Sequence, residues 1–382
     1  MTAARRWCLV AVGIVLLLGT PLAVRALPAD DRDISAADLL TLVQASGSVP
    51  YSGFVESTGT LQLPVADEFS EIADLLGERT RLRVWWQSAE VWRVDAIKPA
   101  GEKDLFHDSS LITSWDYEAE RATTSPEPQV RLPRASDLLP PQLGLLALRD
   151  ARPGEVSRLP AARVAGIDAP GLRLVPAEAQ STIAYVDVWA DPTSGLPLRV
   201  EAYADDEDVP AASTTFLDVS FSTPADDVVW FSPPPGADLE SEDAFDVAAA
   251  ADQFSPLISP QRLAGLESRP GSLSRLMTLR TGVGSWHSAV GDYGRGVTRL
   301  LAVPLWEQSG APLRDQLEAT PGVVEHSYGL SLGVGPLNLL LTPGLFGDER
   351  SYLLAGTVTE RTLAEAAGEL LSGRYLLRVQ GR

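Results

Sequence analysis

Cysteine and histidine are scarce in this chain of 382 residues, and their scarcity removes several kinds of chemistry. The single cysteine, Cys8, lies near the N-terminus, so the remainder of the chain has neither a disulfide nor a thiol nucleophile. His107, His287 and His326 are far apart and have no acidic residue or cysteine at metal-ligand spacing, which argues against a zinc site. We also expect no serine nucleophile at a strand-to-helix elbow. The sequence therefore predicts a protein without cofactor or catalytic metal.

Lysine is rare as well. Only Lys98 and Lys103 occur, and 31 basic residues stand against 51 acidic ones, for a net charge of −20. Such a surface repels the phosphate backbone, so we exclude nucleic acid as a partner. This acidic surface does not attract anionic lipid headgroups electrostatically either, although an apolar pocket can still bind acyl chains.

The N-terminal residues have the pattern of an export signal. Arg5 and Arg6 precede an uncharged apolar run over 7–24. We expect residues 1–29 to be either a signal peptide cleaved near Ala26 or Ala29, or a retained N-terminal membrane anchor, because the run is at the lower limit for spanning a bilayer. Both alternatives export the rest of the chain, so we predict an extracytoplasmic protein, secreted or anchored.

Alternating apolar residues predict a strand-rich first domain over 30–240. Ser35 is placed to cap a helix at 36–45, and a leucine-rich segment at 136–149 is predicted to be helical with a break at Pro140 and Pro141. A short helix is also predicted at 67–76. Strands are predicted at 51–63, 111–117, 171–175, 183–190, 196–203 and 214–221, together with a hairpin over 79–96 and a turn at 191–195. We expect them to form one antiparallel sheet.

Proline and acidic residues mark a linker, 241–270, with a short helix at 245–254, before a smaller α+β domain over 271–382. Strands are predicted there at 296–306, 324–332, 337–341 and 351–357, and helices at 311–319 and after Thr359. The strand at 351–357 is a candidate edge strand, because it lies close to the C-terminus. The glycine-rich stretches at 291–296 and 333–335 are predicted to be tight turns rather than phosphate-binding loops. The acidic run at 205–208 is predicted to be a solvated hairpin tip rather than a calcium site.

Several short motifs resemble one superfamily. VPYSGFV at 49–55 is similar to the opening strand of the periplasmic sigma-factor regulators RseB and MucB. VDVWADP at 186–192, GLPLRVE at 195–201, FLDV at 216–219 and WFSPPPG at 230–236 are similar to the final strands of the LolA lipoprotein-carrier superfamily, and YLLAGTVT at 352–359 resembles the end of the regulators' second domain. The resemblance implies an α+β fold: an open, curved antiparallel half-barrel sheet covered by helices, plus a smaller C-terminal α+β domain.

The resemblance also implies that the covered face of the sheet binds acyl chains of lipids or lipoproteins. The residues whose alternation places them on that face are Leu82, Val84, Trp86, Trp92, Val94, Leu198 and Val200. They are either cavity lining or ordinary core, and the sequence leaves both open. Burying an acyl chain contributes about 0.8 kcal/mol per CH₂, so shape and apolar lining suffice and no chemical motif is needed.

The sequence thus predicts a non-catalytic, lipid- or lipoprotein-binding regulator that acts on an envelope response through a membrane-anchored anti-sigma factor. The alternative is a carrier of lipoproteins or lipids similar to LolA. The second domain favours the regulator, because the resemblance implies that carriers end after the first domain. A third class, an unrecognised hydrolase, has little support from the residues. The second domain either binds a protein partner or packs on the first domain and shields its open side, and the sequence does not decide between these two roles.

Overall fold

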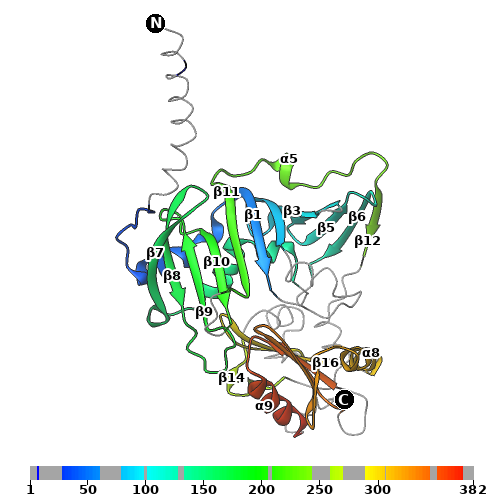
Figure 1. Cartoon of the computed structure of the whole chain (residues 1–382). Helices are drawn as coiled ribbons and strands as arrows, with labels where there is room; N and C mark the ends of the chain where they lie inside the picture. Colours follow the sequence, from blue (N-terminus) through cyan, green and yellow to red (C-terminus); the bar gives the residue numbers. More distant parts are fainter. Residues whose placement is uncertain are drawn as a thin grey trace, which may run out of the picture.

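The computed structural model describes Trp7 and residues 28–60, 79–98, 101–127, 133–204, 209–242, 259–269, 289–305, 307–344 and 351–372. Two sheets dominate these residues, one of twelve strands and one of six (Figure 1). Apart from Trp7, Pro28 and Ala29, the predicted leader lies outside the described residues, as do the helices predicted at 67–76 and 245–254, the acidic run at 205–208, and His287. In the described part of the chain, no helix has the length and apolar character needed to cross a membrane.

The first sheet consists of two runs of strands that meet in its middle. Its strands are β1 (Tyr51–Gly59), β2 (Arg79–Trp86), β3 (Val91–Lys98), β4 (Gly101–Asp108), β5 (Leu111–Asp116), β6 (Arg121–Pro126), β7 (Val156–Val164), β8 (Ile167–Leu174), β9 (Tyr185–Ala190), β10 (Pro197–Tyr203), β11 (Ala212–Ser220) and β12 (Asp238–Ser241). The order is β12-β6-β5-β4-β3-β2-β1-β11-β10-β9-β8-β7, so consecutive strands pair within each run and β11 returns to lie beside β1. Every pair is antiparallel except β12 with β6.

Short helices cover one face of this sheet, which we call the helix face. They are α2 (Ala36–Ala45), η1 (Ser46–Ser48), η2 (Ala135–Leu138), α4 (Pro140–Leu148) and η3 (Pro153–Glu155). A further short helix, α5 (Asp226–Val229), belongs to the segment between β11 and β12, which crosses the opposite, outer face. Ser35 caps α2 by accepting from the Asp38 amide at 3.1 Å. Gly144 lets α4 approach β10 closely, because a Cβ there would lie 2.6 Å from Pro197. α2 and α4 bury their leucines against β8–β10.

The second sheet has the order β15-β16-β20-β19-β18-β17 and is antiparallel throughout. Its strands are β15 (Gly291–Arg295), β16 (Thr298–Leu305), β17 (Val324–His326), β18 (Gly329–Val334), β19 (Leu337–Leu341) and β20 (Ser351–Gly356), and its helices are α8 (Glu307–Glu318) and α9 (Glu360–Leu371). Thr359 caps α9, whose Leu363, Ala366 and Ala367 are fully buried in the core of this sheet. A hairpin, β13 (Arg262–Leu263) and β14 (Leu266–Glu267), packs into the same core.

The fold class agrees with the expectation: an α+β protein with a large, open, curved antiparallel sheet, helices on one face, and a separate smaller sheet (Figure 1). The break in the helical segment at Pro140 and the capping of α2 are also as predicted. At the 191–195 turn, the Asp191 carboxylate accepts from the Ser194 amide at 2.6 Å. Gly195 takes a φ of +73° there, which glycine adopts without strain.

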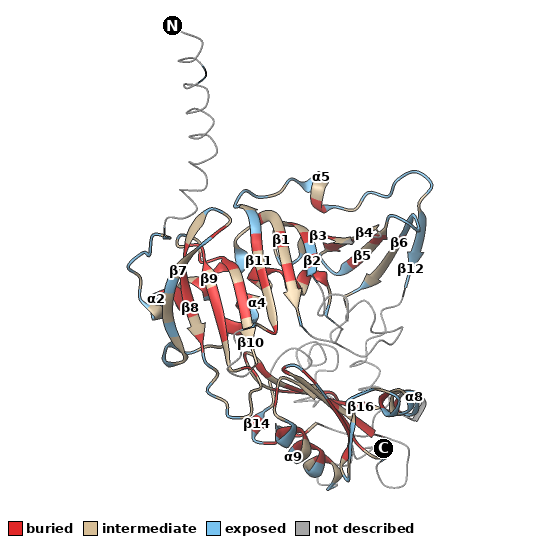
Figure 2. Cartoon of the chain, in the orientation of Figure 1, coloured by how far each residue is buried: buried red, intermediate tan, exposed pale blue. Residues whose placement is uncertain are grey.

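Several expectations were wrong in detail. The strand at 351–357 is not an edge, since β20 lies between β16 and β19. The stretch at 291–296 is mostly strand β15 rather than a tight turn, because Gly291 and Gly294 let it pack against its neighbours: a Cβ on Gly294 would lie 2.1 Å from the Thr298 carbonyl oxygen. Strands β4, β6, β7 and β12 were not expected. β12 is exposed along its length (Figure 2).

Backbone pairing joins the two sheets. In the loop between β8 and β9, Ser181 forms an isolated β-bridge with Val358, which follows β20. The Thr182 amide donates to the Thr357 carbonyl at 3.1 Å, and the Thr359 amide donates to the Gln180 carbonyl at 2.8 Å. Short stretches of backbone hydrogen bonding therefore connect the two sheets.

A charged cluster, the Arg295 clamp, completes this joint. Arg295 ends β15 and donates to the carboxylates of Glu155 and Glu178, both of the first domain, and to the Asp150 carbonyl at 2.7 Å. These hydrogen bonds lower the pKa of Glu155 to about 2. Val297, two residues on, packs beside the α4 core. The clamp thus combines charge with apolar contact.

Candidate functional site

A column of four stacked rings crosses the helix face of the first sheet. Tyr51 stacks on Trp86 (5.8 Å between ring centroids), Trp86 on Trp92 (5.4 Å) and Trp92 on His107 (5.3 Å), with interplanar angles of 6°, 1° and 29°. Each ring comes from the next strand, β1 to β4, and the strand register places the residues directly opposite one another. Such cross-strand pairs stabilise a sheet and give it a continuous aromatic surface. We call these four residues the aromatic column.

A single turn of 3-10 helix covers the column. The buried cluster that contains the three hydrophobic rings of the column also contains Ala135 and Leu138 of η2 and Leu139, which follows it. The Thr214 hydroxyl holds the turn by donating to the Leu138 carbonyl at 2.6 Å. Beside it, the Arg134 guanidinium lies 5.3 Å from the Trp92 ring and forms a bidentate ion pair with Glu127. The cover is therefore short and is anchored by a few identifiable contacts.

All seven residues predicted from the alternating pattern lie on the helix face and are buried. Six of them share one cluster with the aromatic column: Leu82, Val84, Trp86, Trp92, Val94 and Leu198. Val200 lies in the neighbouring cluster beneath α2 and α4. Their role as the lining of an acyl cavity stays a prediction.

Two polar atoms are buried at the ends of the column without a hydrogen-bond partner among the described residues: the Tyr51 hydroxyl and His107 Nδ1. Gln142 of α4 faces the Tyr51 hydroxyl and the Ala89 backbone faces His107, but neither contact reaches hydrogen-bond geometry. Burial raises the pKa of Tyr51 and lowers that of His107, so both groups are neutral at physiological pH. Leaving a buried polar atom unpaired costs about 1–3 kcal/mol.

A pocket of about 210 Å³ opens beside this cover. It is lined by Asp137, Gln142, Leu143, Leu146, Arg149, Asp150 and Arg269. Gln142 both lines this pocket and lies beside the Tyr51 hydroxyl, so the pocket is next to this end of the column. Sequence reasoning missed this pocket and the ends of the column, because both depend on contacts between distant segments.

A serine, a histidine and a glutamate meet in the second sheet, and Gly329-Leu330-Ser331-Leu332-Gly333 fits the Gly-x-Ser-x-Gly pattern that sequence reasoning passed over. His326 Nε2 lies 3.0 Å from the Ser331 hydroxyl and 2.9 Å from Glu360. A catalytic histidine uses one nitrogen for the serine and the other for the acid, whereas here both partners lie at Nε2. Ser331 also sits within β18, flanked by β17 and β19, rather than at a strand-to-helix elbow. This geometry does not support a hydrolase.

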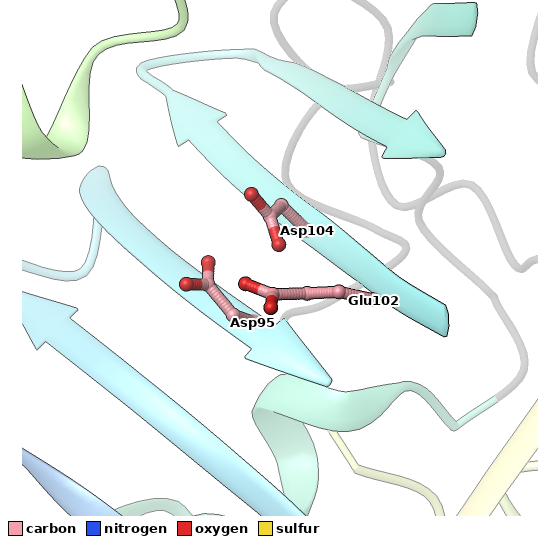
Figure 3. Close-up of side chains that lie close together, drawn as sticks. All are labelled: Asp95, Glu102 and Asp104. Atoms are coloured by element: carbon pink, nitrogen blue, oxygen red, sulfur yellow. The ribbon is translucent and has the colours of Figure 1, made fainter. Parts of the chain in front are cut away.

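Three carboxylates with the spacing of a cation site lie on the outer face of the first sheet, opposite the helix face: Asp95, Glu102 and Asp104 (Figure 3). Arg93 binds both oxygens of Asp95, at 2.6 and 3.0 Å, and Arg83 pairs with Glu102 at 2.7 Å. A metal ion would have to displace these guanidinium groups, so we assign no metal here.

Several solved structures are similar to this chain at low sequence identity. The Pseudomonas aeruginosa MucA/MucB complex structure matches with a TM-score of 0.48 and 13% identity over 91% of this chain and 99% of that one. MucB in complex with MucA(peri) gives 0.46 and 14%, over 87% and 97%. LolA superfamily protein NE2245 from Nitrosomonas europaea gives 0.24 and 12%, over 52% and 98%. No protein-family model and no curated protein matches the sequence. These similarities concern the fold, and we draw nothing about ligands or partners from them.

Proposed function

We propose that this chain is a non-catalytic, extracytoplasmic binding protein whose first sheet holds an acyl chain between the aromatic column and the η2–α4 cover. The observation that carries the proposal is the column itself, with an unpaired polar atom buried at each end. An apolar chain lying along the rings would gain on the order of 12 kcal/mol for 16 carbons at about 0.8 kcal/mol per CH₂, before ordering costs. A carbonyl or hydroxyl of the same ligand would pair with the buried polar atoms.

The pocket beside α4 supplies a route to this site. Its Leu143 and Leu146 suit an acyl chain, and Leu146 is 46% exposed, which is high for a leucine. Arg149 at the same pocket suits an anionic headgroup, whereas Arg269 is paired with Asp150 at 3.5 Å. In this proposal the acyl chain passes Gln142 and lifts the η2 turn, while the headgroup stays at Arg149.

Regulation through a membrane-anchored anti-sigma factor is the downstream role that we propose, on the sequence resemblance described above. The second sheet offers a place for such a partner, since β17 is an edge strand paired only with β18 and its Val324 is 52% exposed. Edge strands bind incoming chains by adding a strand. The alternative, a carrier of lipids or lipoproteins, needs the same acyl site but no protein partner at β17.

Two adjacent tryptophans on β2 test the acyl site, because Trp86 points to the helix face and Trp85 to the outer face. We expect Trp86→Leu to weaken binding of the fluorescent fatty acid cis-parinaric acid about tenfold or more, the equivalent of about 1.4 kcal/mol. The matched control Trp85→Leu should bind as the parent does. The titration is made on exported protein purified without detergent, and urea unfolding verifies that each variant is folded. Equal weakening by both substitutions, or no binding by the parent, contradicts the proposal.

A further inference from the structure

Two aspartates face each other on the outer face of the first sheet. Asp95 of β3 and Asp104 of β4 are directly opposite in the strand register, and both are completely buried. One guanidinium serves both of them: Arg93 binds Asp95 through two nitrogens and donates to Asp104 Oδ2 at 2.8 Å. The second oxygen of Asp104, Oδ1, is buried and has no hydrogen-bond partner among the described residues. Figure 3 shows the two carboxyl groups pointing toward each other between the strands.

The charges around this pair do not balance when every acid is ionised. Glu102 of β4 is neutralised by Arg83 of β2, whose Nε lies 3.8 Å from Asp95. Tyr117, after β5, also faces Asp104, to which it offers a hydroxyl group but no positive charge. Three carboxylates then stand against two guanidinium groups, and the excess negative charge falls on the buried pair. A buried, unpaired charge is far more costly than a protonated carboxyl, which can donate to its neighbour.

We propose that Asp95 and Asp104 hold one proton between them and that its loss and gain form a pH-responsive device on the outer face, independent of acyl binding. Protonation makes the second oxygen of Asp104 a donor, which accounts for its lack of a partner as a carboxylate. Burial, and then the charge of Asp95, raises the pKa of Asp104 to about 7. The device therefore responds within the range of mildly acidic to neutral surroundings.

Arg93 connects this proton to the segment that crosses the outer face. Its guanidinium lies between the rings of Trp85, 5.0 Å away, and Phe106, 4.9 Å away. Phe106 in turn packs on Phe231 of the segment between β11 and β12, with ring centroids 5.2 Å apart. When Asp104 ionises, Arg93 has to compensate two anions in place of one. The packing of Phe106 and Phe231 is the contact that changes with it.

Unfolding of the full chain, measured from pH 5 to pH 9, tests the device. The folded protein keeps a proton on Asp104 that an unfolded aspartate releases near its ordinary value of 3.8. Stability is therefore highest at acidic pH, falls as pH rises to about 7, and levels off above it. For one proton, the unfolding equilibrium constant should rise up to about a hundredfold between pH 5 and pH 7.

Asp104→Asn should remove this slope, because the amide is neutral at every pH. The matched control is Asp187→Asn on the same face, where a single arginine, Arg173, binds both carboxylate oxygens at 2.7 Å; it should keep the slope of the parent. Calcium added to the parent should change nothing. An identical slope in Asp104→Asn, or a flat profile in the parent, overturns the proposal. A slope abolished by calcium also overturns it, because the carboxylates would then be a cation site.

Discussion

Replacing Arg295 by methionine is expected to destabilise the joint between the two sheets by about 3 kcal/mol, the lower end of the range for removing one partner of a buried ion pair. The lower end applies because the Arg295 side chain is 23% exposed. The loss arises mainly from Glu155, whose side chain is 9% exposed and would keep its charge without a partner. Urea unfolding followed by tryptophan fluorescence should show one shared transition in the parent and two separated transitions in the variant.

The effect of this substitution should depend on pH in a defined direction. The folded-state pKa of Glu155 lies near 2 and its ordinary value is 4.5, so the clamp stabilises fully above pH 4.5 and loses its contribution as pH falls toward 2. The difference between parent and variant should shrink over that window. Arg262→Met is the matched control, because its ion pair with Glu267 is exposed on both sides and its loss should leave the midpoint unchanged. A single unshifted transition in Arg295→Met would show that the clamp does not hold the joint.

The second large effect is expected in α4. Leu148 is fully buried between α2 and β8–β10, so Leu148→Ala should cost about 2–5 kcal/mol through the cavity that it leaves. Leu146, two residues earlier on the same helix, is 46% exposed, and Leu146→Ala should remain within about 0.5 kcal/mol of the parent. The urea midpoint measures both. Similar losses in the two variants would mean that α4 does not lie on the sheet as described.

Local features of the sequence predicted the parts of the fold that depend on neighbouring residues. Ser35 caps its helix as expected, since a cap needs only its own side chain and the next turn, and the last helix begins after Thr359 as predicted. The alternation along β2 and β3 predicted the buried face correctly, because a pleated strand turns successive side chains to opposite sides. The resemblance in short motifs supplied the curved shape of the sheet, which alternation alone does not specify.

Features that depend on distant pairings were not predictable in this way. β4 contains Lys103 and Asp104, so its composition did not favour a strand. Because β4 was not predicted, the buried Asp95–Asp104 pair could not be predicted either. Without β4, nothing placed His107 opposite Trp92 at the end of the aromatic column. The Arg295 clamp joins residues 117 and 140 positions apart, a distance over which spacing carries no signal.

The most direct test of the acyl site is cross-linking with a photoactivatable fatty acid, followed by mass spectrometry of the modified peptides. The purified protein is illuminated with the probe bound, and an excess of unlabelled palmitate competes in a parallel sample. We expect palmitate-sensitive cross-links on β2 and β3, around Trp86 and Trp92, and on the cover at 133–148. Cross-links confined to the outer face or to the second sheet, or none that palmitate removes, would contradict it.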